Sequence, residues 1–451
     1  MKRRTFISRI GTISATGAVA TTGVLSAADK PASGRTLNAD VLVIGGGTAG
    51  TIAAIQAGRL GAQTILVESG SQLGGTTTTA GVDFPGLFHA WGKQVIAGIG
   101  WELVTETVKL NSDELPDFTK PTGTQHWRHQ VRICGALYAA LAEEACVKAG
   151  VQLRYYESPT TIVPTPTGWR VRLVGKGTEI EVSAKQLIDC TGNAAVVGLA
   201  GLPRLREKVA QPGTLIYRLG GWDPATVDVE RLQAKLVAAT KSGAVKVTDA
   251  RGNIAGFLRN GGENAMHVSG ADSSTSEAHT ATNIQGRQSL LRMMRFLKQE
   301  PAFGLLHVER LQAETGVRET FRIVGETSVK VDDYQTGRVF EDAIAHSFYP
   351  IDLHVDGSIV PKHLKEGVVP TIPRSALIPK GSKNLMVAGR CVSSDRLANS
   401  ALRVQASCMA MGQAAGAAAA LAAQGKSTPR QVSLAELRRV LREHGAIVPA
   451  T

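Results

Sequence analysis

The stretch Ala39-Asp-Val-Leu-Val-Ile-Gly45-Gly-Gly47-Thr-Ala-Gly50 decides the fold of this 451-residue chain. An apolar, strand-like run (residues 39–44) leads into the spacing Gly-x-Gly-x-x-Gly, and a helix-like run (residues 51–61) follows it. This order aims backbone N–H groups and the positive end of a helix dipole at one point, where a pyrophosphate can bind. The stretch therefore predicts a βαβ unit that holds a dinucleotide.

A second strand-like run, residues 63–67, ends in Glu68, which lies 18 residues beyond Gly50. A carboxylate at this spacing accepts hydrogen bonds from the hydroxyls of an adenosine ribose and disfavours a 2′-phosphate, so NADP is not expected. The alternative is a parallel βαβ unit with a glycine turn and an incidental surface glutamate.

The N-terminus, Lys2-Arg3-Arg4-Thr5-Phe6-Ile7, precedes a weakly apolar stretch and the small residues Ser26-Ala27-Ala28. This resembles a twin-arginine export signal over residues 1–28, and it predicts a periplasmic or secreted protein. A basic disordered tail and a Sec signal are the alternatives. The stretch is too short and too rich in Gly and Thr for a membrane anchor, which needs ~20 apolar residues.

The composition, 43% hydrophobic and 20% charged, is that of a soluble protein with two or three domains. The net charge is +12, and four of the positive charges lie in the N-terminal segment. The rest of the sequence has no Lys/Arg run with interleaved aromatic residues, so no nucleic-acid partner is expected. No Cys-x-x-Cys pair occurs, so no metal site is expected. The five cysteines are Cys134, Cys146, Cys190, Cys391 and Cys408.

Two later segments repeat the order of strand and glycine. They are Asp189-Cys-Thr-Gly192 and Val387-Ala-Gly389-Arg390-Cys391, and a small-residue run with Gly412-Gln-Ala-Ala-Gly416 follows the second. Together with the first motif they resemble the bacterial FAD-dependent oxidoreductase family, which has a glutathione-reductase-type FAD domain. The central segments 316–325, 349–354 and 372–375 are also similar to it, and the resemblance runs from about residue 38 to 425.

The resemblance implies an α/β fold, a Rossmann-like FAD-binding domain whose mixed sheet carries a β-meander and which is split by an inserted α+β substrate domain. After the signal, the expected parts are the first FAD-binding part, the substrate or cap domain, the second FAD-binding part and a C-terminal helical tail. Their residues are 38–202, 203–375, 376–425 and 426–451.

The resemblance also assigns residues to the cofactor. It places Gly45, Gly47 and Gly50 at the pyrophosphate, Glu68 at the adenosine ribose, Gly74, Gly75 and Thr76 near the ribityl chain and flavin, Gly192 on the adenine side, and Gly389 and Arg390 by the ribityl phosphate. Thr48, Ala49, Ser69 and Leu402 complete the expected FAD set. Many related proteins carry Gly-Asp where this chain has Gly389-Arg390, so a ribitol-to-carboxylate contact is in doubt.

Three residues are the expected catalytic groups. Arg403 lies where the resemblance places a helix N-terminus under the flavin, so its charge could stabilise anionic reduced flavin; a structural ion pair is the alternative. His354 suits acid or base chemistry, with domain packing as its alternative. Arg318, with Arg322, could bind a substrate carboxylate, or could pair with a carboxylate such as Glu319 at the domain junction.

A second Gly-x-Gly-x-x-Gly in a strand–helix setting and a redox cysteine pair are both missing from the sequence. Electrons are therefore expected to come directly from a bound substrate or a partner. The expected function is an exported enzyme that takes a hydride from a small organic substrate and passes electrons to a periplasmic or membrane acceptor. Fumarate-reductase-like reduction of an activated double bond and non-catalytic flavin binding are the alternatives.

The apolar, alanine-rich segment that begins at Ala398 could be a membrane span or an internal helix. Its polar residues Arg403, Gln405 and Gln413 and its many small residues favour a packed internal helix over a membrane span. No stable membrane span is therefore expected.

Overall fold

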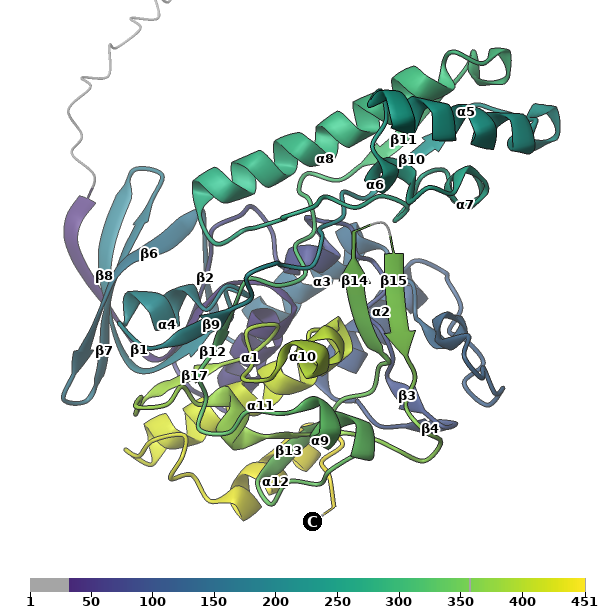
Figure 1. Cartoon of the computed structure of the whole chain (residues 1–451). Helices are drawn as coiled ribbons and strands as arrows, with labels where there is room; N and C mark the ends of the chain where they lie inside the picture. Colours follow the sequence, from purple (N-terminus) through teal and green to yellow (C-terminus); the bar gives the residue numbers. More distant parts are fainter. Residues whose placement is uncertain (1–31, 357, 451) are drawn as a thin grey trace, which may run out of the picture.

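The computed structural model describes residues 32–356 and 358–450. The expected export signal, residues 1–28, lies outside the described residues. Within them, a seven-stranded mixed sheet is the main layer, and a group of helices projects from it on one side (Figure 1).

The parallel part of the sheet has the order β5-β2-β1-β8, with β17 beside the end of β8. These strands bring the predicted glycine turn and Glu68 to one edge, because β1 and β2 both end there. Their bounds are β5 Gln152–Tyr155, β2 Thr64–Glu68, β1 Ala32–Ile44, β8 Thr178–Asp189 and β17 Leu385–Val387.

The antiparallel part is a meander in which β6 (Glu157–Thr165) pairs with β7 (Gly168–Gly175), and β7 pairs with β8. The long strand β8 belongs to both parts: β7 pairs with its first half, and β17 pairs with its last residues. The mixed sheet with a meander confirms the predicted fold class.

Helices α1 (Thr48–Arg59) and α11 (Gln405–Gln424) pack closely together in the largest hydrophobic core. Small residues allow this approach, since a Cβ at Gly416 would lie 2.2 Å from the carbonyl oxygen of Ala53. Among the described residues α11 is the one helix long and apolar enough to cross a membrane, yet 89% of its most apolar window is buried inside the protein. This burial agrees with a packed internal helix.

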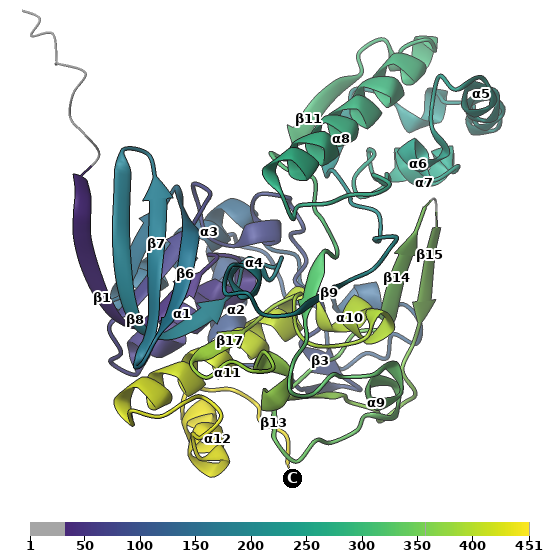
Figure 2. The ribbon, with the colours of Figure 1, turned by 60° about the vertical axis from the view of Figure 1, so that its left-hand side comes forward.

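The inserted part has a core of its own, built by residues between Leu215 and Val317 from helices, strand β10 and connecting segments. Figure 2 shows these helices standing apart from the sheet. By contrast, residues between Val329 and Ile378 pack in the same core as α1 and α11. The segment 329–375, which the sequence assigned to the substrate domain, thus shares its hydrophobic core with the FAD-binding part.

The remaining elements are short or lie at the periphery. The helices are α2 Ile99–Leu110, α3 Gly135–Lys148, α4 Ala195–Leu199, α5 Val229–Ser242, α6 Val247–Ala250, α7 Ile254–Arg259, α8 Ser276–Leu297, α9 Val331–Thr336, α10 Arg396–Leu402 and α12 Leu434–Glu443. The strands are β3 His89–Ala90, β4 Lys93–Gln94, β9 Arg204–Arg206, β10 Tyr217–Gly220, β11 His307–Leu311, β12 Phe321–Ile323, β13 Ala343–His346, β14 Ile351–Val355, β15 Ser358–Lys362 and β16 Thr371–Pro373.

Candidate functional site

The glycine turn between β1 and α1 is possible only without side chains. Gly45 has φ +101°, and a Cβ there would lie 2.5 Å from the carbonyl oxygen of Cys190; a Cβ at Gly50 would lie 1.8 Å from that of Gly45. Gly47 is the N-cap of α1, and no side chain caps the helix. The first N–H groups of α1 therefore lie open to an anion, as a pyrophosphate site requires.

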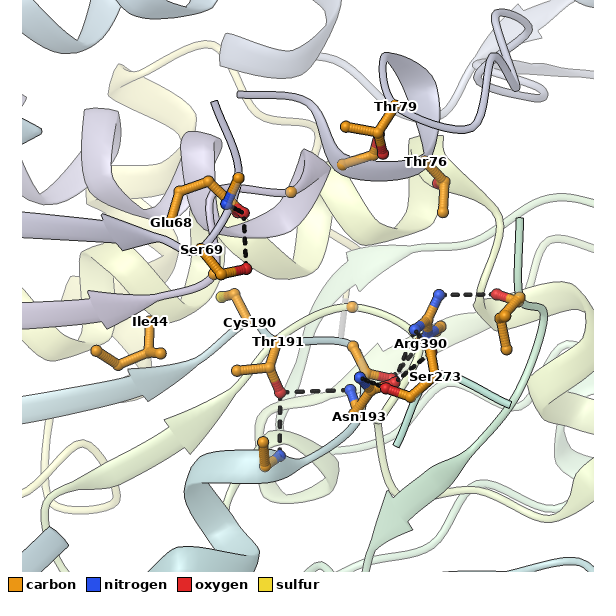
Figure 3. Close-up of a pocket in the computed structure, with 18 of the residues that line it drawn as sticks. Ile44, Glu68, Ser69, Thr76, Thr79, Cys190, Thr191, Asn193, Ser273 and Arg390 are labelled. Carbon is orange, nitrogen blue, oxygen red and sulfur yellow. Dashed lines mark hydrogen bonds between the residues drawn. The ribbon is translucent and has the colours of Figure 1, made fainter. Parts of the chain in front are cut away.

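Glu68 ends β2 beside this turn. One carboxylate oxygen accepts a hydrogen bond from the Gly46 N–H at 2.7 Å, and the other accepts from the Gly70 N–H at 2.6 Å and from the Ser69 hydroxyl at 3.1 Å. A carboxylate has about four lone-pair sites, so Glu68 retains capacity for a ligand hydroxyl. Figure 3 shows Glu68 and Ser69 beside the cavity.

A cavity of about 580 Å³ begins at the turn and lies between the sheet and the inserted part, within the size range of ligand sites. Eight stretches of chain far apart in the sequence contribute to its wall. The predicted cofactor residues that line it are Gly45, Gly47, Thr48, Ala49, Glu68, Ser69, Gly75, Thr76, Gly192, Gly389 and Arg390. The structure thus brings most of the predicted set to a single cavity.

Three predicted cofactor residues do not line the cavity. Gly50 packs against the strand ends. Gly74, with φ +104°, donates its N–H to the Gly46 carbonyl at 2.8 Å and so fixes the loop that carries Gly75. Leu402 is fully buried at the end of α10, directly before Arg403. These three residues support the residues that line the cavity.

Arg390 joins the two parts of the molecule across the cavity. Its guanidinium donates to the carbonyls of Gly192 and Val317, each at 2.7 Å, and to the side chains of Asn193 and Ser273 at 2.8 and 3.1 Å. Figure 3 shows the side chain beside Asn193 and Ser273. Four donated hydrogen bonds leave it one N–H for a ligand.

Polar residues that the sequence did not single out complete the wall. The turn after β8 is held by Asp189, whose fully buried carboxylate accepts from the Thr191 N–H and hydroxyl at 3.0 and 2.7 Å. Burial raises the pKa of Asp189, while these hydrogen bonds oppose the rise. The Thr-Gly pair after a strand and the Ser-rich stretch 273–276 were the available signals. The additional lining residues include Thr79, Thr191, Asn193, Ser273, Ser274, Thr275, Gly316, Val317 and Gln405.

Arg403 also lines the cavity, and it is anchored from behind by Asp352. Its Nη2 donates to the Asp352 carbonyl at 3.2 Å and lies 3.6 Å from the Asp352 carboxylate. Its Nε is buried and has no hydrogen-bond partner among the described residues. A buried donor without a partner is costly, so this N–H points to a ligand acceptor.

His354 lies behind Asp352 and does not line the cavity. Its Nε2 lies 3.0 Å from the Asp352 carboxylate, and its Nδ1 lies 3.2 Å from Nε2 of His267. Burial, aided by the charge of Arg318, lowers the pKa of His354 to about 4 and that of His267 to about 3. Burial opposes ionisation of Asp352, but its bond to His354 and the nearby arginines lower its pKa to about 2. Neutral imidazoles therefore support an ionised carboxylate.

The two arginines of the Gly-Val-Arg-Glu-Thr-Phe-Arg segment have different surroundings. Arg318 donates to the Pro212 carbonyl at 2.5 Å and does not line the cavity, although Val317 before it does. Burial and the charge of Arg403 lower the pKa of Arg318 to about 9. Arg322 is paired with Glu207 and donates to the Ser394 carbonyl, which is a structural arrangement.

No group of three or more His, Cys, Asp or Glu side chains that could hold a metal ion occurs among residues 32–356 and 358–450. The cysteines in this part of the chain are free, and four of the five are buried.

In comparison with known proteins, a family model described as FAD dependent oxidoreductase matches residues 40–441, which is most of the chain. Curated proteins give no match. A geranylgeranyl bacteriochlorophyll reductase-like protein from Thermoplasma acidophilum is 14% identical, with 90% of this chain and 84% of that chain covered and a TM-score of 0.43. An anhydrotetracycline hydroxylase from Streptomyces rimosus is 13% identical, with 90% and 69% covered and a TM-score of 0.43.

Proposed function

The chain belongs to the FAD-dependent oxidoreductase family, and from this premise we propose that it takes a hydride from a small organic substrate and passes the electrons to an external acceptor. It is an enzyme, and its cofactor is FAD, which supplies two-electron redox chemistry when bound. We also propose that its FAD-binding part is of the glutathione-reductase type, on the basis of the glycine turn, Glu68 and the meander between β5 and β8.

The residues of the cavity fit FAD. The open N-terminus of α1 offers N–H groups to a pyrophosphate, and the carboxylate of Glu68 can accept from a ribose hydroxyl. Gly45 and Gly75 have φ of +101° and +54°, and a Cβ at Gly75 would lie 2.9 Å from the Gly47 Cα. Glycine is therefore favoured at both positions, and no side chain keeps a ligand away from the backbone there. Arg403 then offers an unpartnered N–H where the loops from the inserted part meet the cavity.

The single observation behind direct oxidation of a substrate is that the described residues contain one sheet with a glycine turn of this type. A dithiol relay is disfavoured as well, because burial raises the pKa of Cys190, and raises that of Cys408 to about 12. Both thiols line the cavity and stay protonated, whereas a thiolate is the reactive form. Both observations support entry of the substrate into the cofactor cavity itself.

The test of this function starts with purified protein and its visible spectrum. Anaerobic addition of a panel of alcohols, amines and hydroxy acids should bleach the flavin absorbance, and a quinone or a cytochrome should restore it. A protein that bleaches only with artificial reductants, and is reoxidised by a compound with an activated double bond, would show the opposite direction of electron flow. A protein that cannot be loaded with FAD would refute the proposal.

We further propose export through the twin-arginine pathway, which serves proteins that fold around a cofactor before transport. The support is the sequence of residues 1–28 alone. Fractionation of cells that express the full chain should place flavin-loaded protein in the periplasm, and replacement of Arg3 and Arg4 by Lys should retain it in the cytoplasm. Equal distribution of both forms would contradict export by this route.

A further inference from the structure

Three arginines form a group that begins at the cavity wall, and two of them interact with one carboxylate. Arg403 and Arg318 both interact with the charge of Asp352, and Arg251 adds its positive charge to Arg318. Arg318 has the Pro212 carbonyl as its hydrogen-bond acceptor, and Arg251 has the Asn264 carbonyl. Neither forms an ion pair with a carboxylate of the described residues. The three guanidiniums, which we call the arginine cluster, therefore exceed their one carboxylate by two charges.

The neighbouring groups do not correct this excess. His267 and His354 are buried and cannot supply negative charge, and the nearby Glu319 is already paired with Arg396. Arginines that are shielded from water are normally paired with anions. An unpaired guanidinium that has lost its hydration destabilises the folded protein. The arginine cluster therefore carries positive charge that the carboxylates of the described residues do not balance.

The cavity gives an anion access to the cluster. Arg403 lines the same cavity as Gly316 and Val317, and its Nε is buried without a hydrogen-bond partner among the described residues. Arg318 follows Val317 in the chain, so its charge stands directly behind the same wall. An anionic oxygen at Arg403 Nε would be bound by a charge-assisted hydrogen bond in the field of two further arginines.

We propose that the substrate of this enzyme is a small organic carboxylate, bound by Arg403 at the cavity wall with Arg318 and Arg251 supplying the balancing charge. This inference rests on the proposed function, since it names the substrate class of the same cavity. The negative charge of a reduced flavin is the other source of an anion at Arg403. The two sources differ in one property. An oxidised flavin ring is neutral, whereas a carboxylate substrate is negatively charged whether the flavin is oxidised or reduced.

The experiment therefore uses the FAD-loaded, oxidised protein and matched pairs of probes. Acetate, succinate and benzoate are titrated by calorimetry and by changes in the visible spectrum, each against its amide. At least one carboxylate should bind at least tenfold more tightly than its amide. In Arg318→Gln that preference should fall at least tenfold, and in Arg318→Lys it should largely return. Arg231→Gln, which removes an exposed arginine from α5, is the control and should keep the preference.

The outcomes separate this inference from the function on which it rests. Protein that lacks flavin absorbance after loading refutes the function before any probe is added. Flavin-loaded protein in which no carboxylate exceeds its amide refutes the carboxylate substrate and leaves the function standing. A lower flavin reduction potential in Arg318→Gln, without any carboxylate preference in the parent protein, assigns the cluster to the flavin and also overturns the proposal. Circular dichroism of both Arg318 variants establishes that they are folded.

Discussion

Gly412 of α11 lies so close to Ala49 of α1 that a Cβ on the glycine would come within 2.2 Å of the Ala49 carbonyl oxygen. Ala49 also lines the cofactor cavity, in the first turn of the helix that is open to the pyrophosphate. Gly412→Ala should therefore force α1 outward, lower the free energy of unfolding by about 1–3 kcal/mol, and weaken FAD binding. Urea unfolding and FAD titration of the apoprotein measure the two effects.

The matched control is Gly304→Ala, because Gly304 is exposed and its Cβ would meet its nearest neighbour at 3.6 Å, an ordinary contact. It should change neither stability nor FAD affinity. If Gly412→Ala were also neutral in both assays, close packing of α11 on α1 would not be what positions the pyrophosphate turn.

Glu68→Gln tests the ribose end of the cavity. The carboxylate now accepts two backbone N–H groups, from Gly46 and Gly70, whereas an amide has one acceptor oxygen and brings an NH₂ toward the second donor. Loss of one hydrogen bond to a charged acceptor should raise the Kd of FAD about tenfold to a hundredfold. Fluorescence titration of FAD into the apoprotein measures this, with the exposed Glu106→Gln on α2 as the control. An unchanged Kd would remove Glu68 from the site.

The sequence already places the glycine turn and Glu68 next to each other, because local chemistry determines their positions. Gly45 requires a positive φ, Gly47 opens a helix, and Glu68 ends the neighbouring parallel strand, so short-range pattern and sheet geometry already place them together. These residues alone indicate a dinucleotide, whereas FAD and the mixed sheet are expected from the family resemblance that the two later strand-and-glycine segments also carry.

Short-range sequence patterns do not predict which distant segments form the cavity wall. Ser273 reaches the cavity because Arg390 holds it against Asn193, a contact between residues far apart in the chain. Arg318 and His354 lie close to Arg403, but the structure sets them behind the wall, and no spacing in the sequence distinguishes a residue that lines a cavity from one that supports it. The shared core is a further long-range feature, since residues 329–375 pack with helices distant in sequence.

Acid should destabilise the protein partly through His267. Its folded-state pKa is lowered to about 3, chiefly by burial, whereas an unfolded histidine titrates near 6.5. Below pH 6.5 the unfolded chain therefore binds more protons, so stability falls as pH falls toward 3. Between pH 7 and pH 5 the protonation of this group in the unfolded chain lowers the free energy of unfolding by about 2 kcal/mol. In His267→Gln, where the amide can still donate to His354, the loss measured by urea unfolding should shrink by about that amount. Exposed His307→Gln is the control; an equal change in both variants would contradict the assignment.

Arg403, besides binding the substrate carboxylate, should raise the flavin's electron affinity through its positive charge, and it should not be needed for FAD binding. It is the cluster member at the cavity wall, and it is anchored through Asp352. Arg403→Ala should therefore retain FAD, slow flavin reduction by substrate about a hundredfold, and lower the two-electron potential by about 30–60 mV. Asp352→Asn removes a negative charge beside the same arginine, so it should shift the potential upward. Spectroelectrochemistry measures both shifts and anaerobic stopped flow the rate. Shifts of the same sign in the two variants would show that disruption of the site, and not charge, is the cause.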